Sequence, residues 1–170
     1  KERYRFLAKA LGGIKAYGVN TPITLLQILD INGLDDALWA LRACDDAENF
    51  SRLLACDYAE HVLHIFETRY PDDYRPREAI AVSRRYSRGE ATDAELSAAW
   101  NAAGAAAEAA AETAAWAAAW TAAETAAETA AWADAWIAAR AAARADAWTP
   151  ERMWQEARLR ELLEGGKSDV

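Results

Sequence analysis

The sequence predicts an all-α protein, a compact bundle with short N-terminal helices and antiparallel alanine-rich C-terminal helices. Three observations favour this class: apolar residues recur at helical spacing, capping residues and Pro or Gly punctuate the chain, and alanine dominates the second half. A length of 170 residues suits one domain. We expect a single domain over 1–170, with a conventional helical core (1–90), alanine-rich repeat helices (91–148) and a closing helix (149–164).

The first 45 residues predict three short helices. Apolar residues at helical spacing run over 3–16, where two glycines weaken the helix and Gly18 ends it. In "TPITLLQILDING", Thr21 is the expected N-cap, Pro22 suits the first turn, and Gly33 belongs to the stop signal. The next helix, "LDDALWALRA", is expected to bury its larger apolar residues, Leu38, Trp39 and Leu41.

A longer helix follows Asp45 and must end by about Arg69, because Pro71 disfavours helix before it. Its apolar stripe is expected to lie in the core: Phe50, Leu53, Leu54, Tyr58, Val62, Leu63 and Phe66. Pro76 then starts another helix, which ends at Gly89. The next helix begins at "TDAE", a capping box over residues 92–95.

From Thr92 onward, marked residues recur at every fourth position among alanines: Trp100, Gly104, Glu108, Glu112, Trp116, Trp120, Glu124, Glu128, Trp132, Trp136, Arg140, Arg144 and Trp148. Slippage of the coding DNA is a sufficient explanation for this tetrad repeat. Four residues rotate a helix by about 400°, so the marked stripe drifts by about 40° per step. One straight helix therefore cannot bury all the tryptophans against one surface.

The repeat is also too long for one helix of a compact domain. An unbroken helix from Ala105 to Trp148 would span about 66 Å, against about 40 Å for a domain of this size. The tract either folds back into antiparallel helices or protrudes and pairs with another chain, which would make a homo-oligomer. We expect it to fold back, with a break between Thr121 and Thr129, where threonine lowers helix propensity.

The closing helix is predicted from Thr149, Pro150 and Glu151, which form a helix start. Its expected core stripe consists of the apolar residues Met153, Trp154, Ala157, Leu159, Leu162 and Leu163. Two glycines at 165 and 166 end the helix. The closing helix is therefore expected to pack by ordinary hydrophobic burial.

Composition and charge exclude several classes. The net charge is −8, with eight acidic residues and no Lys or Arg between Glu90 and Ala139. Such a surface disfavours nucleic acid and suits a basic partner. No apolar run suits a membrane span, and the start of the sequence lacks a signal peptide pattern, so we expect a cytoplasmic protein with no membrane partner. Cys44 and Cys56 are expected to be reduced core residues.

The segment around residues 56–67 invites a metal or catalytic interpretation. Glu60, His64 and Glu67 share one helix face, and Cys56 lies one turn earlier. The order of Glu60, His61 and His64 matches neither His-Glu-x-x-His nor Glu-x-x-His, and the chain has no third histidine. Cys56 and His64 are too far apart to share a hydrogen bond. We therefore expect no metal, no cofactor and no catalysis, and assign Glu60 and His64 an interhelical hydrogen-bonding role.

A family resemblance supplies the lead on function. The order "GLDDALWALRA", "ACDYAEHVLHIFETRYPDDYRPREAI", "SRRYSRGEAT" and an alanine-rich tract resembles bacterial and phage proteins catalogued as immunity proteins. The resemblance spans about residues 20–164, and its most specific part is 56–80. It implies a small all-helical cytoplasmic protein that neutralises a toxin by binding it, and it implies no catalytic residues.

Three hypotheses follow. The leading one is a non-enzymatic binding protein that presents an acidic helical face to a basic toxin or effector, with the contacts Glu108, Glu112, Glu124 and Glu128. The second is a phage or bacterial counter-defence protein that sequesters a small anionic, nucleotide-like signal, lined by Arg69, Arg75, Arg77, Arg84 and Arg85. The third is an enzyme or metalloprotein centred on Cys56, Glu60, His61 and His64.

Overall fold

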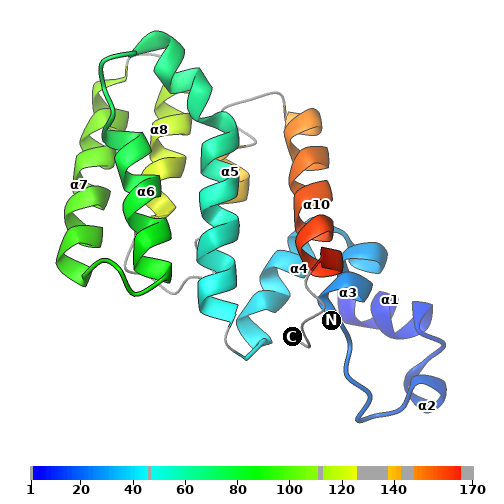
Figure 1. Ribbon diagram of the computed structural model, residues 1–170. Coiled ribbons are helices and arrows are strands. Elements are labelled where there is room, and N and C mark those ends of the chain that lie inside the picture. Colours follow the sequence, from blue (N-terminus) through cyan, green and yellow to red (C-terminus); the bar gives the residue numbers. More distant parts are fainter. Residues whose placement is uncertain (1, 46, 111–112, 126–137, 143–147, 166–170) are drawn as a thin grey trace.

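A computed structural model describes residues 2–45, 47–110, 113–125, 138–142 and 148–165. All regular secondary structure in these ranges is helical, which confirms the predicted all-α class (Figure 1). None of the described helices is both long and apolar enough to cross a membrane. The division into one domain with three parts stays a prediction.

The N-terminal part contains α1 (Glu2–Ala10), α2 (Ile14–Tyr17), α3 (Leu25–Asn32), α4 (Leu34–Ala40) and the 3-10 turn η1 (Leu41–Ala43). The predicted helix over 3–16 is split, because Gly12 and Gly13 adopt positive φ angles of 86° and 84°. The predicted cap Thr21 is wrong. Thr24 caps α3 in a capping box with Gln27, whereas the Thr21 hydroxyl donates to the Tyr17 carbonyl.

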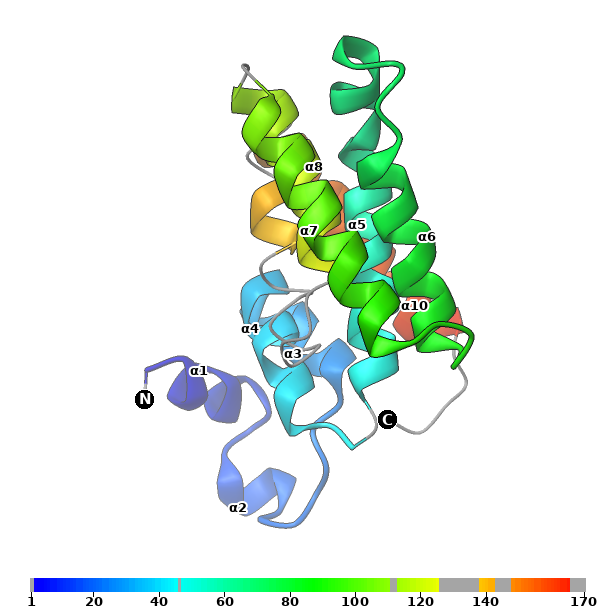
Figure 2. The ribbon, with the colours of Figure 1, turned by 90° about the vertical axis from the view of Figure 1, so that its left-hand side faces the viewer.

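The central helix is α5 (Ala47–Arg69), which ends just before Pro71 as the sequence predicted. Figures 1 and 2 show it beside α6 (Arg75–Ser87) and α8 (Thr113–Thr125), and α7 (Asp93–Ala109) packs against α6 and α8. The Thr92 hydroxyl accepts from the Glu95 backbone N–H and the Glu95 carboxylate accepts from the Thr92 backbone N–H, so the predicted capping box at α7 is confirmed.

The alanine-rich tract does fold back into antiparallel helices. The chain leaves α7 at Ala110, which has an extended backbone, and this turn comes before the predicted break. Helix α8 is described as far as Thr125, and residues 126–129 lie outside the described residues, so the break between Thr121 and Thr129 stays a prediction. No Gly or Pro marks the turn at Ala110, so packing of both helices in the bundle decides its position.

Helix α10 (Trp148–Gly165) lies on the other side of α5 from α7 (Figure 1). The predicted apolar stripe is correct at Leu159, which is buried, and wrong at Met153, which is 68% exposed. Ala157 is exposed as well. The buried face instead carries Glu151 and Gln155, two turns and one turn before Leu159. Hydrogen bonds to these polar groups allow them to replace apolar side chains there.

Two predicted core residues of the N-terminal half lie at the surface. Leu38 and Leu41 are buried as expected, but Trp39 is 58% exposed, because it lies beside the buried stripe of α4 and not on it. Leu53 is also exposed, while its neighbour Leu54 is buried in α5. The larger part of the predicted α5 stripe nevertheless lies in the core.

Candidate partner-binding surface

The tetrad residues of α7 and α8 meet along one edge of the antiparallel pair. A Cβ added at Gly104 would lie 3.9 Å from a ring carbon of Trp120, so these two positions face each other. Ala99, Ala103 and Ala123 share one apolar cluster, which fixes the same register. Because the two helices are antiparallel, one turn before Gly104 on α7 corresponds to one turn after Trp120 on α8. Trp100 is therefore opposite Glu124, and in the other direction Glu108 is opposite Trp116.

We name this edge the tetrad surface and define it by Trp100, Gly104, Glu108, Trp116, Trp120 and Glu124. Trp100 and Trp116 are 39% and 37% exposed. The rings of Trp116 and Trp120 are stacked, with centroids 5.8 Å apart and planes 8° from parallel. Because each helix holds only a few tetrads, the drift of about 40° per step does not carry the stripe off this edge.

Glu124 carries the most unusual electrostatics of the tetrad surface. Its side chain is half-buried, and among the described residues no cation pairs with it. Burial raises the pKa of the Glu124 carboxyl above its ordinary value, because the charged form loses hydration without gaining a partner. A cation that binds to this carboxylate would therefore offset the hydration that the charged form has lost.

The structure places the predicted acidic contacts as follows. Glu108 is exposed on α7 and Glu124 is half-buried on α8, and the antiparallel packing brings both to the tetrad surface. Glu112 and Glu128 lie outside the described residues. The sequence interpretation gave the surface tryptophans Trp100 and Trp116 no part in partner binding. Their recurrence at the same tetrad spacing as the glutamates was the signal that could have joined them to the site.

The arginines of the second hypothesis pair with carboxylates at separate places. Arg77 bonds Glu67 of α5 at 2.6 Å, and Arg84 reaches both Asp57 and Glu60. The other pairs are Arg75 with Asp73 and Arg85 with Glu95. Arg69 is exposed and also has an interaction. These pairs stabilise helix contacts and are not gathered around one hollow, so the arginine-lined pocket stays a prediction with little support from the geometry.

The side chains of the metal hypothesis point to different neighbours. Glu60 accepts from Arg84 of α6, which confirms its predicted interhelical role, whereas His64 Nδ1 contacts the His61 carbonyl of its own helix. The interhelical role predicted for His64 is therefore wrong. Cys56 is buried, and burial raises the pKa of its thiol to about 12, which disfavours the reactive thiolate. Among the described residues, no three His, Cys, Asp or Glu side chains form a metal-binding group.

His61, not His64, joins α5 to another helix. Its Nδ1 lies 2.7 Å from Glu151 Oε2, and its ring stacks on Trp154 with centroids 3.7 Å apart. The Gln155 amide donates to Glu151 Oε1 and to the Ala139 carbonyl. These contacts satisfy the buried carboxylate and tie α10 to α5 and to the helical residues 138–142. We interpret them as a structural connection.

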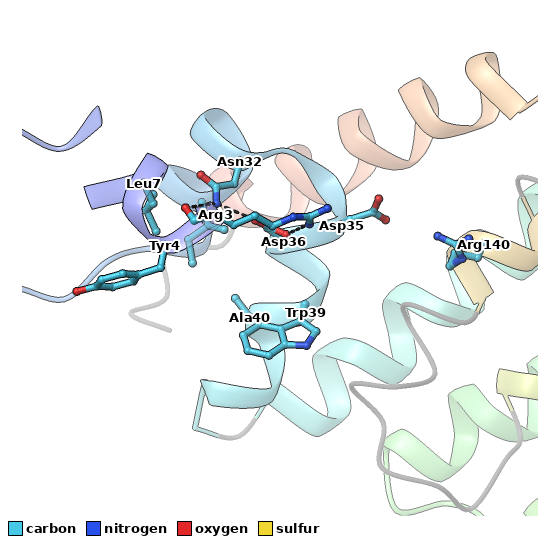
Figure 3. A pocket seen from close by; sticks show the side chains of 10 residues that line it. Arg3, Tyr4, Leu7, Asn32, Asp35, Asp36, Trp39, Ala40 and Arg140 are labelled. Atoms are coloured by element: carbon cyan, nitrogen blue, oxygen red, sulfur yellow. Dashed lines mark hydrogen bonds and ion pairs between the residues drawn. The ribbon is translucent and has the colours of Figure 1, made fainter. Parts of the chain in front are cut away.

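A cavity of about 570 Å³ lies at the N-terminal end of the molecule, between α1, α3 and α4 (Figure 3). Its walls include Leu7, Trp39 and Arg140. Arg3 of α1 pairs with Asp36 of α4, and the Asn32 amide donates to Asp36 at 2.7 Å. These bonds hold α1 over the cavity. Because these charged groups pair within the protein, a molecule bound in the cavity would contact mainly apolar side chains.

Trp39 and Tyr4 are exposed aromatic residues of this cavity, and the sequence interpretation had placed Trp39 in the core. The guanidinium carbon of Arg42 lies 4.7 Å from the centroid of the Trp39 ring. The buried positions of α4 and η1, Leu34, Ala37, Leu38 and Leu41, follow strict helical spacing that excludes Trp39. That spacing was the signal that could have placed Trp39 outside the core.

The family comparison covers most of these features. The family model described as "Imm-5 like putative immunity protein" matches residues 52–162. That segment is more than half of the chain and contains the tetrad surface and the contacts between α5 and α10, but the cavity residues before it lie outside the match. No curated protein and no solved structure matches the sequence. The helical fold and the family match agree with the resemblance, and the chain belongs to the Imm-5-like immunity protein family.

Proposed function

We propose that this protein is a non-enzymatic immunity protein that neutralises a basic toxin or effector by binding it through the tetrad surface. The proposed contacts are the predicted acidic residues Glu108, Glu112, Glu124 and Glu128 together with the tryptophans of that surface. Family membership supports a protein partner in general. The net charge of −8 supports a basic one, because complementary charge speeds association and favours the correct partner.

The observation that carries this proposal is the half-buried Glu124 carboxylate beside exposed tryptophans. A protein gains nothing in stability from a carboxylate that loses hydration and finds no cation, so a role in binding explains it better than a role in folding. Tryptophan is enriched among the residues that dominate binding energy at protein interfaces. Trp100 and Trp116 therefore supply apolar contact next to the charge.

The dispersed positions of Cys56, Glu60, His61 and His64 support a binding function over catalysis. Each of them has neighbours that explain it structurally: a buried apolar cluster for Cys56, Arg84 for Glu60, Glu151 for His61 and the His61 carbonyl for His64. General acid–base chemistry requires such groups to converge on one reactive position, which these do not.

Affinity capture from the native host tests the proposal. The tagged protein is incubated with host lysate at low and at high salt, and bound proteins are identified by mass spectrometry. We expect a basic protein that is recovered at low salt and largely lost at high salt, because exposed charge pairs are screened. Its gene should be toxic when expressed alone, and co-expression of the present protein should restore growth.

The matched variant is Glu108→Gln combined with Glu124→Gln, with Glu90→Gln and Glu156→Gln as a control of equal charge change away from the surface. We expect the first pair to lose capture and growth rescue and the control pair to keep both. Recovery of no protein at low salt would count against the function. Equal loss with both pairs would count against the tetrad surface as the contact.

A further inference from the structure

We infer that Trp100, Trp120 and Glu124 form a subsite for the guanidinium group of an arginine side chain. This inference rests on the proposed function and names the residue type through which the partner is recognised. It concerns one end of the tetrad surface, where two aromatic residues and one carboxylate come from two different helices. Three steps lead to it.

The first step is the position of the three side chains. Trp120 precedes Glu124 by one turn on α8, so both lie on the same side of that helix. Trp120 faces Gly104, and the cluster of Ala99, Ala103 and Ala123 brings the preceding turn of α7 beside Glu124. Glu124 therefore has Trp120 on one side and Trp100 on the other.

The second step is the chemistry that these groups select. The face of a tryptophan ring attracts a cation, and a carboxylate forms a charge-assisted hydrogen bond with it. The Trp100 ring is 39% exposed, so a partner side chain can reach it. Burial penalises the charged form of Glu124 in the free protein, and a bound cation would relieve that penalty.

The third step separates arginine from lysine. A guanidinium group is planar, stacks on an aromatic face and donates two parallel hydrogen bonds to a carboxylate, whereas an ammonium group is a compact and strongly hydrated charge. The exposed Trp100 beside one half-buried carboxylate suits the flat cation better, with Trp120 closing the other side. The other end of the tetrad surface lacks a half-buried carboxylate, because Glu108 is exposed.

The test uses three peptides of equal length in which glycine alternates with arginine, with lysine or with uncharged citrulline. Binding to the full chain is measured by tryptophan fluorescence at low salt, and the indole N–H signals are followed by NMR. We expect the arginine peptide to bind about threefold or more tighter than the lysine peptide, and the citrulline peptide not to bind. The Trp100 indole signal should shift most.

Three variants assign the effect to the subsite. Glu124→Gln should weaken binding of the arginine peptide by about tenfold, since it removes the charged acceptor. Trp100→Leu, which keeps an apolar side chain at this partly exposed position, should weaken it by about threefold or more. Glu90→Gln carries the same charge change at an exposed position away from the tetrad surface and should weaken it by less than about twofold. Circular dichroism checks that each variant is folded.

Equal affinity for the arginine and lysine peptides would overturn the inference, as would equal losses in Glu124→Gln and Glu90→Gln. Failure of the arginine subsite can be distinguished from failure of the proposed function. If a captured toxin binds Glu124→Gln as tightly as the unchanged protein, the arginine subsite is wrong and the function stands. If the peptides discriminate as expected but no toxin is captured, the subsite stands and the function is wrong.

Discussion

Helices α8 and α10 pack against the same helix, α5, by opposite means. Helix α8 contributes alanines, and Ala117, Ala118 and Ala119 pack with Val62 and Phe66 of α5 in one apolar cluster. Helix α10 contributes large polar side chains: the buried Glu151 carboxylate contacts His61 of α5, and the Gln155 backbone carbonyl accepts from the Tyr58 hydroxyl. Small apolar side chains allow close approach and gain dispersion contacts, whereas buried polar groups require complete hydrogen bonding.

The comparison teaches where each interface is vulnerable. The alanine interface tolerates no extra volume, because protein interiors are packed as densely as organic crystals. The polar interface tolerates no missing partner, because an unsatisfied buried group loses hydration without compensation. The next three predictions test this difference, from the largest expected effect to the smallest.

Replacement of the buried carboxylate should have the largest effect. Glu151→Ala leaves His61 and Gln155 without their shared acceptor and should lower the free energy of unfolding by about 2–4 kcal/mol. Urea unfolding followed by circular dichroism measures it. Glu156→Ala on the same helix removes only a partly exposed pair with Arg160 and should cost less than about 0.5 kcal/mol. Similar losses in both variants would contradict a special role for the buried cluster.

Extra volume in the alanine interface should have an intermediate effect. Ala118 is fully buried between α8 and α5, so Ala118→Leu should lower stability by about 1–3 kcal/mol through overpacking. Thermal unfolding gives the change. Ala105→Leu places the same side chain on an exposed position of α7 and should change stability by less than about 0.5 kcal/mol. An unchanged melting temperature in Ala118→Leu would mean that the helices are less closely packed than described.

A single added methyl group should have the smallest effect, with the opposite sign. Gly104→Ala should raise stability by about 0.5–1 kcal/mol, because its Cβ meets Trp120 only at 3.9 Å and alanine favours helix. Gly33→Ala is the contrasting variant, since Gly33 has a φ of 85° and alanine there would be strained. Chemical unfolding compares them. Destabilisation by Gly104→Ala would show that Trp120 leaves no room at this edge.

The sequence predicted most of the local structure correctly where the signals are local. The end of α5 before Pro71 and the capping box of Thr92 with Glu95 follow from backbone chemistry within a few residues. The fold-back of the alanine-rich tract followed from its length. Thr21 failed as a cap because Thr24 competes for the same helix start and has Gln27 three positions later.

The candidate site was only partly predictable. The glutamates were marked by their spacing and charge, and the fold brings Glu108 and Glu124 to one edge. The turn at Ala110 fixes which residues of α7 and α8 are opposite each other, and no Gly or Pro in the sequence marks this turn. The sequence therefore could not show that Trp100 and Glu124 share one edge of the α7–α8 pair.

By itself the sequence determined the helical class, the main helix boundaries in the middle of the chain and the acidic character of the alanine-rich half, because propensity, capping and charge are properties of neighbouring residues. Only the tertiary structure decided the turn at Ala110, the exposure of Trp39 and the burial of Glu151 and Gln155. These depend on partners such as His61, which is 90 residues away from Glu151. Whether a buried polar residue stabilises the core depends on whether such distant groups complete its hydrogen bonds.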